Sequence, residues 1–153
     1  MICKNIHQIW IGDQLPDKYN VWVDTIKQHH PEWNYKLWTS NDITQLIRET
    51  FPELLPMYNE YTYTIQKCDV ARLFILYKFG GLYADLDIQF FKNVERLIER
   101  PCVLFHQYPD ESSLGYRRNF PNNIPTITNS IFYASKHNKF IHNCIKNLKL
   151  TKD

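Results

Sequence analysis

The sequence lacks the features that mark disulfide-rich, membrane-spanning and nucleic-acid-binding proteins. Its four cysteines, Cys3, Cys68, Cys102 and Cys144, show no C-x-x-C spacing, and there is no N-x-S/T glycosylation sequon. No apolar run approaches the length that spans a bilayer, so no transmembrane segment is expected. The net charge of +2 comes from scattered basic residues, which argues against nucleic acid as a partner. Thiols of this kind and a polar N-terminus predict a cytoplasmic protein.

Apolar residues, by contrast, are plentiful enough for one hydrophobic core. They make up 44% of the 153 residues, and this length is typical of one domain. Residues 4–11 and 35–38 have the pattern of strands, and residues 19–30 and 42–50 that of helices, the second capped by Ser40 or Asn41. Such alternation is typical of α/β proteins. We therefore predict a single α/β domain over residues 1–153, with a mixed, mainly parallel sheet flanked by helices.

The remaining segments are less regular. Residues 102–105 and 127–134 are predicted strands, and residues 139–150 form a predicted amphipathic helix. Residues 107–125 form a long loop in which Arg117 and Arg118 either reach a phosphate or lie in solvent. Residues 51–64 contain Pro52, Pro56 and three tyrosines. We expect the prolines to break regular structure there, and the rings either to line a sugar site or to fill the core.

The most informative stretch is residues 66–91, QKCDVARLFILYKFGGLYADLDIQFF. Apolar residues recur at helical spacing over residues 65–79, and Gly80-Gly81 is expected to end this helix because glycine adopts the left-handed conformation of a helix cap. Residues 82–88 then alternate with a period of two, which predicts a strand. Tyr83, Asp85 and Asp87 would share one face of that strand, with apolar residues on the other.

Two carboxylates in an Asp-x-Asp (D-x-D) pattern point to a divalent cation. Side by side, Asp85 and Asp87 repel each other unless a positive charge lies between them. Mg²⁺ and Mn²⁺ take oxygen ligands of this type and share them with substrate phosphates. The alternative is a solvated strand face with two ordinary acids.

Two further positions are candidates for ligand contact. Asp69 and Arg72 are three residues apart and share one helical face, where they either form a salt bridge or orient a ligand. Trp10 lies at the end of the first predicted strand, and ligands of nucleotide-binding α/β domains collect beyond the carboxyl ends of strands. Its indole either stacks on a nucleobase or packs in the core. His7 is interpreted as a core histidine.

The two motifs together resemble a known family. Residues 67–87, KCDVARLFILYKFGGLYADLD, and residues 7–12, HQIWIG, resemble the D-x-D glycosyltransferases of family thirty-two. That family includes initiating α-1,6-mannosyltransferases and enzymes of capsular polysaccharide synthesis. The resemblance extends over about residues 4–145 and, more distantly, to the catalytic domains of large glucosylating cytotoxins. It implies a compact GT-A-like fold with a Rossmann-like nucleotide-binding core.

The resemblance also implies roles for individual residues. Asp87 would bind Mn²⁺ or Mg²⁺ directly, and Asp85 would contact the ribose and the metal-bound waters. Asp69 and Arg72 would contact the donor sugar, the ribose or the phosphates, so these four are the candidate catalytic residues. The nucleotide-sugar site would further include the stacking Trp10 together with Ile9, Ile11, Tyr83 and Asn129.

The function implied is a metal-dependent hexosyltransferase that retains anomeric configuration. The donor would be a UDP- or GDP-sugar, and the acceptor a glycan, a lipid-linked group or a protein. Two alternatives stay open: a catalytically silent nucleotide-sugar-binding protein, and a phosphohydrolase in which a D-x-D aspartate attacks phosphate. Against the phosphohydrolase, the acid pair lies in the middle of the chain rather than after the first strand.

Overall fold

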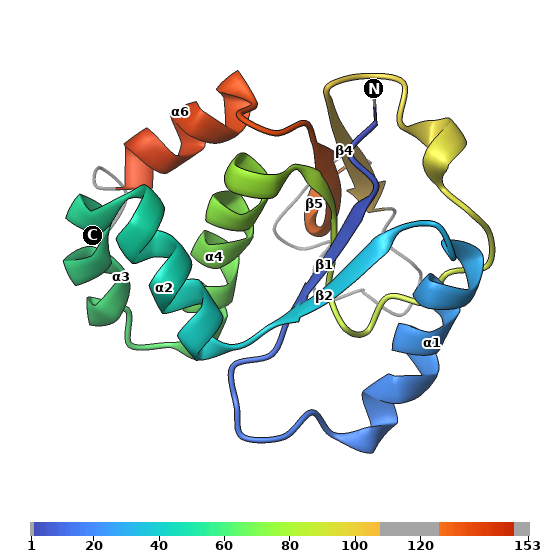
Figure 1. Cartoon of the computed structure of the whole chain (residues 1–153), viewed down its shortest axis with the longest axis horizontal. Coiled ribbons are helices and arrows are strands. Elements are labelled where there is room, and N and C mark those ends of the chain that lie inside the picture. The colour runs from blue at the N-terminus through green and yellow to red at the C-terminus, as the bar shows by residue number, and fades with distance from the viewer. Residues whose placement is uncertain (1, 108–125, 149–153) are drawn as a thin grey trace.

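The structure, a computed structural model, describes residues 2–107 and 126–148 and has an α/β architecture (Figure 1). The strands are β1 (Asn5–Ile9), β2 (Asn34–Trp38), β3 (Gly81–Ala84), β4 (Cys102–Gln107) and β5 (Thr126–Ala134). The helices are α1 (Asn20–His29), α2 (Ser40–Thr50), α3 (Leu55–Glu60), α4 (Thr64–Phe79) and α6 (Lys139–Asn147). Short 3-10 turns are η1 (Asp17–Tyr19), η2 (Pro52–Leu54) and η3 (Glu95–Leu97).

The strands of the described residues form one mixed sheet of order β2-β1-β3-β5-β4. β3 is the central strand, and β1 lies between β2 and β3 and pairs in parallel with both. β5 pairs antiparallel with β3 and with β4. The mixed sheet with flanking helices confirms the predicted fold class, although parallel and antiparallel pairings are equal in number. Consecutive antiparallel strands need no crossover helix between them, so β5 can pair with β4, which precedes it in the chain.

Helices cover both faces of the sheet, so the core has two halves (Figure 1). On one face α2, α4 and α6 pack over Ile9 and Tyr83. On the other, Ile26 of α1 and Trp33 pack over Ile6. Successive side chains of a strand point to opposite faces, so β1 contributes side chains to both halves of the core. Its buried residues are Ile6 and Ile9 together with two polar side chains, His7 and Gln8.

Helix α2 begins earlier than the sequence pattern predicts. Its cap is Thr39, not Ser40 or Asn41: Asp42 N–H donates to Thr39 Oγ1, and the backbone N–H of Thr39 donates to the Asp42 carboxylate. This reciprocal pair is a capping box, which satisfies two donors that the helix itself leaves unpaired.

The prolines of residues 51–64 begin helical turns rather than break regular structure. Pro52 opens η2, and Pro56 lies in the first turn of α3. The first N–H groups of a helix have no internal partner, so proline loses nothing there. Tyr58 is buried in the core, which favours the packing interpretation for this segment, whereas Tyr63 is exposed.

The two glycines after α4 make a turn that no other residue fits. Gly80 has φ +63° and Gly81 has φ +118°, both outside the range that side chains favour. A Cβ on Gly81 would lie 2.4 Å from the carbonyl oxygen of Asn5, at the start of β1. The glycines end α4, as the sequence predicts, and the turn brings β3 directly against β1.

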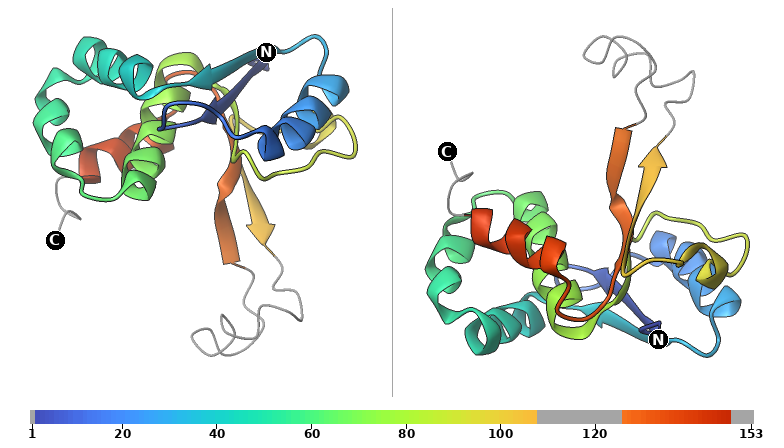
Figure 2. Two further views of the ribbon diagram at one scale, coloured as in Figure 1. Left: turned by 90° about the horizontal axis from the view of Figure 1, so that it is seen from below. Right: turned by 90° about the horizontal axis from the view of Figure 1, so that it is seen from above.

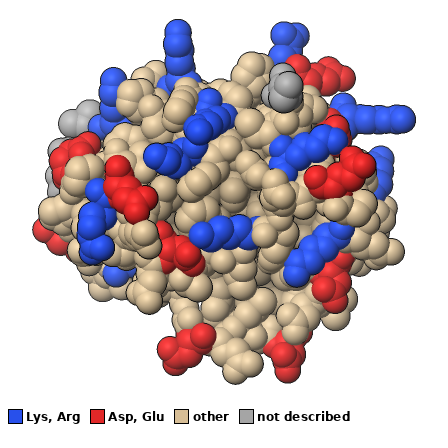
Figure 3. Space-filling view, in the orientation of Figure 1, with Lys and Arg blue, Asp and Glu red and all other residues tan. Residues whose placement is uncertain are grey.

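β4 and β5 project together beyond the remainder of the sheet (Figure 2). Their register shifts between Leu104 and Phe105. The predicted loop of residues 107–125, with Arg117 and Arg118, lies almost wholly outside the described residues. On the face shown in Figure 3, acidic and basic side chains are interspersed. Among residues 2–107 and 126–148, no helix is both long and apolar enough to cross a membrane.

Candidate active site

The D-x-D pair lies in a turn, not on a strand face. β3 ends at Ala84, and residues 85–88 form a turn closed by the Ile88 N–H, which donates to the carbonyl oxygen of Asp85 at 3.2 Å. The backbone N–H of Asp85 donates to Ser130 of β5 at 2.7 Å. The expected alternation of one apolar and one acidic face is therefore wrong, because both faces of β3 are covered by helices and buried. The turn instead places Asp87 in solvent, beyond the carboxyl end of the strand.

Arg72 is the buried charge around which the site is arranged. Its side chain is 2% exposed, and Nη2 lies 2.7 Å from the Asp69 carboxylate and 3.6 Å from that of Asp85. Nη1 donates to the backbone carbonyl of Asn129, and Nε to that of Cys68. The guanidinium lies 4.6 Å from the ring centre of Tyr83. A buried charge without partners is very unfavourable, and these contacts supply them.

Asp85 is held by its neighbours rather than free to turn. The hydroxyl of Tyr83 donates to Asp85 Oδ1 at 2.6 Å, on the same oxygen that faces Arg72. Burial raises the pKa of Asp85, while the Tyr83 hydroxyl and the Arg72 charge act in the opposite direction. Burial likewise raises the pKa of Tyr83, which therefore stays a hydroxyl donor. Oδ1 is thus engaged by protein groups, which favours an orienting role for this aspartate.

Asp69 and Asn129 come together from distant parts of the chain. Asn129 Nδ2 donates to Asp69 Oδ1 at 3.1 Å, which links β5 to α4. Arg72 bonds both partners, one through its carboxylate and the other through its backbone. The structure thus gathers Asp69, Arg72, Asp85 and Asn129 into one connected group.

A cavity of about 300 Å³ opens beside this group, between the ends of β1 and β3. Trp10 at the end of β1 and Asp87 in the turn after β3 both line it. A volume of this size suits a small-molecule ligand. Seven of the predicted site residues line the cavity: Ile9, Trp10, Ile11, Arg72, Tyr83, Asp85 and Asp87. Asp69 and Asn129 join them through Arg72.

Trp10 bears an unusual buried group. Its indole N–H has no hydrogen-bond partner among the described residues, although the nitrogen is buried. Its ring centre lies 5.7 Å from that of Tyr19, which also lines the cavity. A Cβ at position 12 would lie 2.9 Å from the indole nitrogen, so Gly12 leaves the indole its place. A buried donor that none of the described residues satisfies is available to a hydrogen-bond acceptor that enters the cavity.

The acidic residues of the site fit a divalent cation whose other ligands are waters and substrate phosphates. Asp87 is exposed in the turn, which leaves its carboxylate open to a metal. Among the described residues there is no group of three or more His, Cys, Asp or Glu side chains that could enclose an ion. Mg²⁺ commonly binds through one or two carboxylates, completed by waters and substrate phosphates. The site therefore suits a metal that arrives with a diphosphate.

Two buried polar residues of β1 were not in the predicted site. Gln8 is fully buried, and its Nε2 donates to the carbonyl oxygen of Asp85 at 3.1 Å. His7 bonds Gly80 and Trp38, which agrees with its interpretation as a core histidine. The sequence of β1 gives no signal that singles out Gln8, because the strand also contains the polar residues Asn5 and His7.

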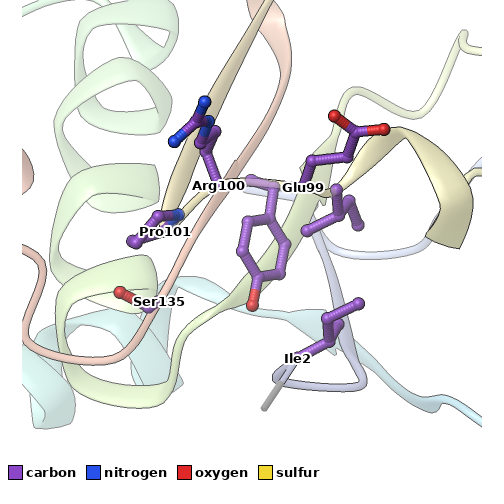
Figure 4. Close-up of a pocket in the computed structure, with 7 residues that line it drawn as sticks. Ile2, Glu99, Arg100, Pro101 and Ser135 are labelled. Atoms are coloured by element: carbon purple, nitrogen blue, oxygen red, sulfur yellow. The ribbon is translucent and has the colours of Figure 1, made fainter.

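A second cavity, of about 370 Å³, lies at the end of the sheet where β1 begins (Figure 4). It is lined by Ile2, Ile98, Glu99, Arg100, Pro101, Tyr133 and Ser135. Figure 4 shows the charged ends of Glu99 and Arg100 pointing apart. The cavity does not adjoin the D-x-D turn and contains none of the predicted site residues.

Solved structures identify the class of fold. PaToxG glycosyltransferase superposes with a TM-score of 0.63 and 17% identity, and the match covers 97% of this chain and 62% of that structure. The ligand-free glycosyltransferase domain of the YGT toxin gives a TM-score of 0.51 and 12% identity, with the same coverage. The fold is therefore that of a GT-A-like glycosyltransferase domain, as the sequence resemblance implies.

Sequence comparison identifies the family. Residues 16–104 match the model described as a glycosyltransferase sugar-binding region containing a DXD motif, and the chain belongs to this family. Inositol phosphoceramide mannosyltransferase 1 of Schizosaccharomyces pombe is 32% identical over 150 residues, which are 96% of this chain and 43% of that protein. Mannosyl phosphorylinositol ceramide synthase SUR1 of Saccharomyces cerevisiae is 30% identical over 125 residues, 82% of this chain and 32% of that protein. The chain thus spans less than half the length of these relatives.

Proposed function

We propose that this chain is the donor-binding region of a metal-dependent hexosyltransferase that uses a nucleotide sugar. The observation that carries the proposal is the buried Arg72, which ties Asp69, Asp85 and Asn129 together beside a cavity between Trp10 and Asp87. Stacking of a base on Trp10 would leave the diphosphate beside the turn. Family membership favours this function over a phosphohydrolase.

The residues divide the work of donor binding. Asp87 would hold Mn²⁺ or Mg²⁺, which supplies Lewis-acid stabilisation to the departing diphosphate. Asp85, fixed by Tyr83 and Arg72, would orient the ribose or the metal-bound waters. Asp69, about two-fifths exposed, is positioned to accept a hydrogen bond from a sugar hydroxyl. Rigid placement of this kind lowers the barrier because the groups need not reorganise during transfer.

The names of the relatives suggest which substrates to test first. One is an inositol phosphoceramide mannosyltransferase, and another is a mannosyl phosphorylinositol ceramide synthase. We propose a hexose donor, with GDP-mannose as the first candidate, and a hydroxyl acceptor of the glycan or lipid-linked kind, with transfer that retains anomeric configuration. The anomer of the product, read by NMR from the one-bond coupling between C1 and H1, decides the last point.

The test is a thermal-shift titration of UDP, GDP and their common sugars with Mn²⁺, Mg²⁺ or EDTA. A ligand at 100 times its Kd stabilises the fold by about 2.7 kcal/mol, which is a shift of several degrees for a domain of this size. We expect one nucleotide to give a shift that needs metal and disappears in Asp87→Ala. A shift for no nucleotide, with or without metal, would overturn the donor-site assignment.

A nucleotide-sugar-binding protein without transfer is the second candidate. The two candidates differ in donor hydrolysis: a transferase releases nucleoside diphosphate from its donor at a measurable rate, and a silent binder does not. Release of inorganic phosphate from a simple phosphomonoester would instead indicate a phosphohydrolase.

A cytoplasmic location stays a prediction; fractionation of the source cells tests it.

A further inference from the structure

We propose that Gln8 is a positioning residue that holds the D-x-D turn at a fixed place relative to Trp10. Both amide atoms of this fully buried side chain are used: Nε2 donates to the carbonyl oxygen of Asp85 at 3.1 Å, and Oε1 accepts from the hydroxyl of Tyr35 at 2.9 Å. The consequence for metal and donor binding rests on the proposed function; the anchoring of the turn does not.

The bond from Gln8 is one of three that fix the backbone of Asp85. The carbonyl oxygen of Asp85 also accepts from Ile88 N–H, which closes the turn, and its own N–H donates to Ser130. Gln8 therefore joins the turn to β1, while Ser130 joins it to β5. The turn carries Asp87, for which residues 2–107 and 126–148 provide no other anchor of this kind, so its position follows from that of Asp85.

Gln8 also relates the two ends of the cavity to each other. It lies two residues before Trp10, which directly follows β1 and whose backbone N–H donates to the carbonyl oxygen of Trp38 in β2 at 2.9 Å, so one short segment held by β2 carries both the indole and the anchor of the turn. Tyr35 of the neighbouring strand β2 holds the amide from its other end, since it donates to Oε1. The carbonyl oxygen of Asp85 can only accept, so it must face the NH₂ end of the Gln8 amide. The oxygen end then faces the hydroxyl of Tyr35, and the amide has one orientation.

The burial of Gln8 supports a specific role for its side chain. A buried amide is unfavourable compared with an apolar residue unless it is hydrogen-bonded. Gln8 bonds the turn at Asp85, and its other bond, from Tyr35, holds the amide in place for that contact. Loss of a hydrogen bond that supports a metal ligand typically weakens metal binding 10–100-fold. The bond from Gln8 would support Asp87 in this way, through the backbone of Asp85.

The test compares Gln8→Met with His7→Phe. Methionine is similar in size to glutamine but makes neither hydrogen bond. His7 is a matched control: it is the adjacent buried polar residue of β1, yet its bonds lead to Gly80 and Trp38 rather than to the turn. Two readouts are measured for each variant: the Kd of UDP and of GDP with Mn²⁺ by calorimetry, and amide hydrogen exchange of Ile88 relative to the amides of β3.

We expect Gln8→Met to weaken metal-nucleotide binding by about 10-fold or more and to speed exchange at Ile88, while His7→Phe changes binding less than about twofold. Equal binding losses in both variants, with no local change at Ile88, would overturn the proposal. If the wild type binds neither nucleotide, the proposed function fails, and exchange at Ile88 alone decides whether Gln8 anchors the turn.

A milder variant covers the case in which Gln8→Met does not fold. Tyr35→Phe removes only the hydroxyl that donates to Oε1 and leaves the bond between Gln8 and Asp85 in place. We expect a smaller loss of metal-nucleotide affinity in the same direction, with faster exchange at Ile88. No change in either quantity would overturn the proposal.

Discussion

Acid should destabilise this protein through His7, a buried histidine whose second proton is unfavourable in the folded state. His7 is 4% exposed; its Nε2 lies 2.9 Å from the carbonyl oxygen of Gly80, and its Nδ1 accepts from Trp38 Nε1–H at 3.2 Å. A carbonyl only accepts, so Nε2 carries the proton and Nδ1 is bare. Protonation of Nδ1 would point two N–H groups at each other in the core. Burial is the largest cause that lowers the pKa of His7, from 6.5 to about 4.

The sign and size of the effect follow from linkage. Below pH 6.5 the unfolded chain takes up a proton that the folded state does not take up until about pH 4. The stabilisation is therefore fully present above pH 6.5 and is lost as the pH falls. The free energy of unfolding should drop by about 2 kcal/mol at pH 5 and about 3 kcal/mol at pH 4 from this residue alone. His30, whose pKa is lowered mainly by burial, adds to the loss.

Urea denaturation followed by tryptophan fluorescence, at half-unit steps from pH 7.5 to pH 4.5, measures this dependence. His7→Phe removes the titrating group, so the variant should be less stable at pH 7 but lose about 2 kcal/mol less than the wild type between pH 7 and pH 5. Parallel curves for the two proteins would show that another group is responsible and that the assignment to His7 is wrong.

Three further substitutions probe the site and the turn that leads to it. Arg72→Met should lower the free energy of unfolding by about 3 kcal/mol and abolish metal-dependent nucleotide binding. The loss is at the low end for a broken buried ion pair because the carboxylates of Asp69 and Asp85 keep contact with water. Retained binding would contradict the central role of Arg72. Tyr83→Phe should cost about 1 kcal/mol and weaken that binding, because the hydroxyl no longer holds the first aspartate of the D-x-D turn; unchanged calorimetric titrations would refute this. Gly81→Ala should destabilise by about 1–3 kcal/mol or more in urea, since φ is +118° and the added Cβ meets backbone; a neutral effect would show that β1 and β3 can separate.

Much of the fold can be predicted from local patterns in the sequence. Helical spacing over residues 65–79 and the two glycines that follow predict α4 and its end, because both are properties of neighbouring residues. The i, i+3 spacing likewise predicts the contact between Asp69 and Arg72, which the structure places at 2.7 Å. The family resemblance, carried by two short motifs, is confirmed by the matching family model.

Where a strand ends is decided by the tertiary structure. Alternation continues through Asp87 in the sequence, yet β3 stops at Ala84, since its pairing with β1 ends at Tyr83 and its pairing with β5 at Ala84. A period of two describes a half-buried strand, and β3 is covered on both faces, so its polar residues begin only where the strand leaves the sheet.

The sequence by itself determined which chemistry the site holds: the acids, the arginine and the tryptophan occur in motifs that can be identified without coordinates. Only the tertiary structure decided how these groups support one another. Asn129 meets Asp69 across 60 positions of sequence, and Gln8 reaches the backbone of Asp85 across 77. Such contacts depend on the strand order and on the pleat of β1, and no local pattern encodes them.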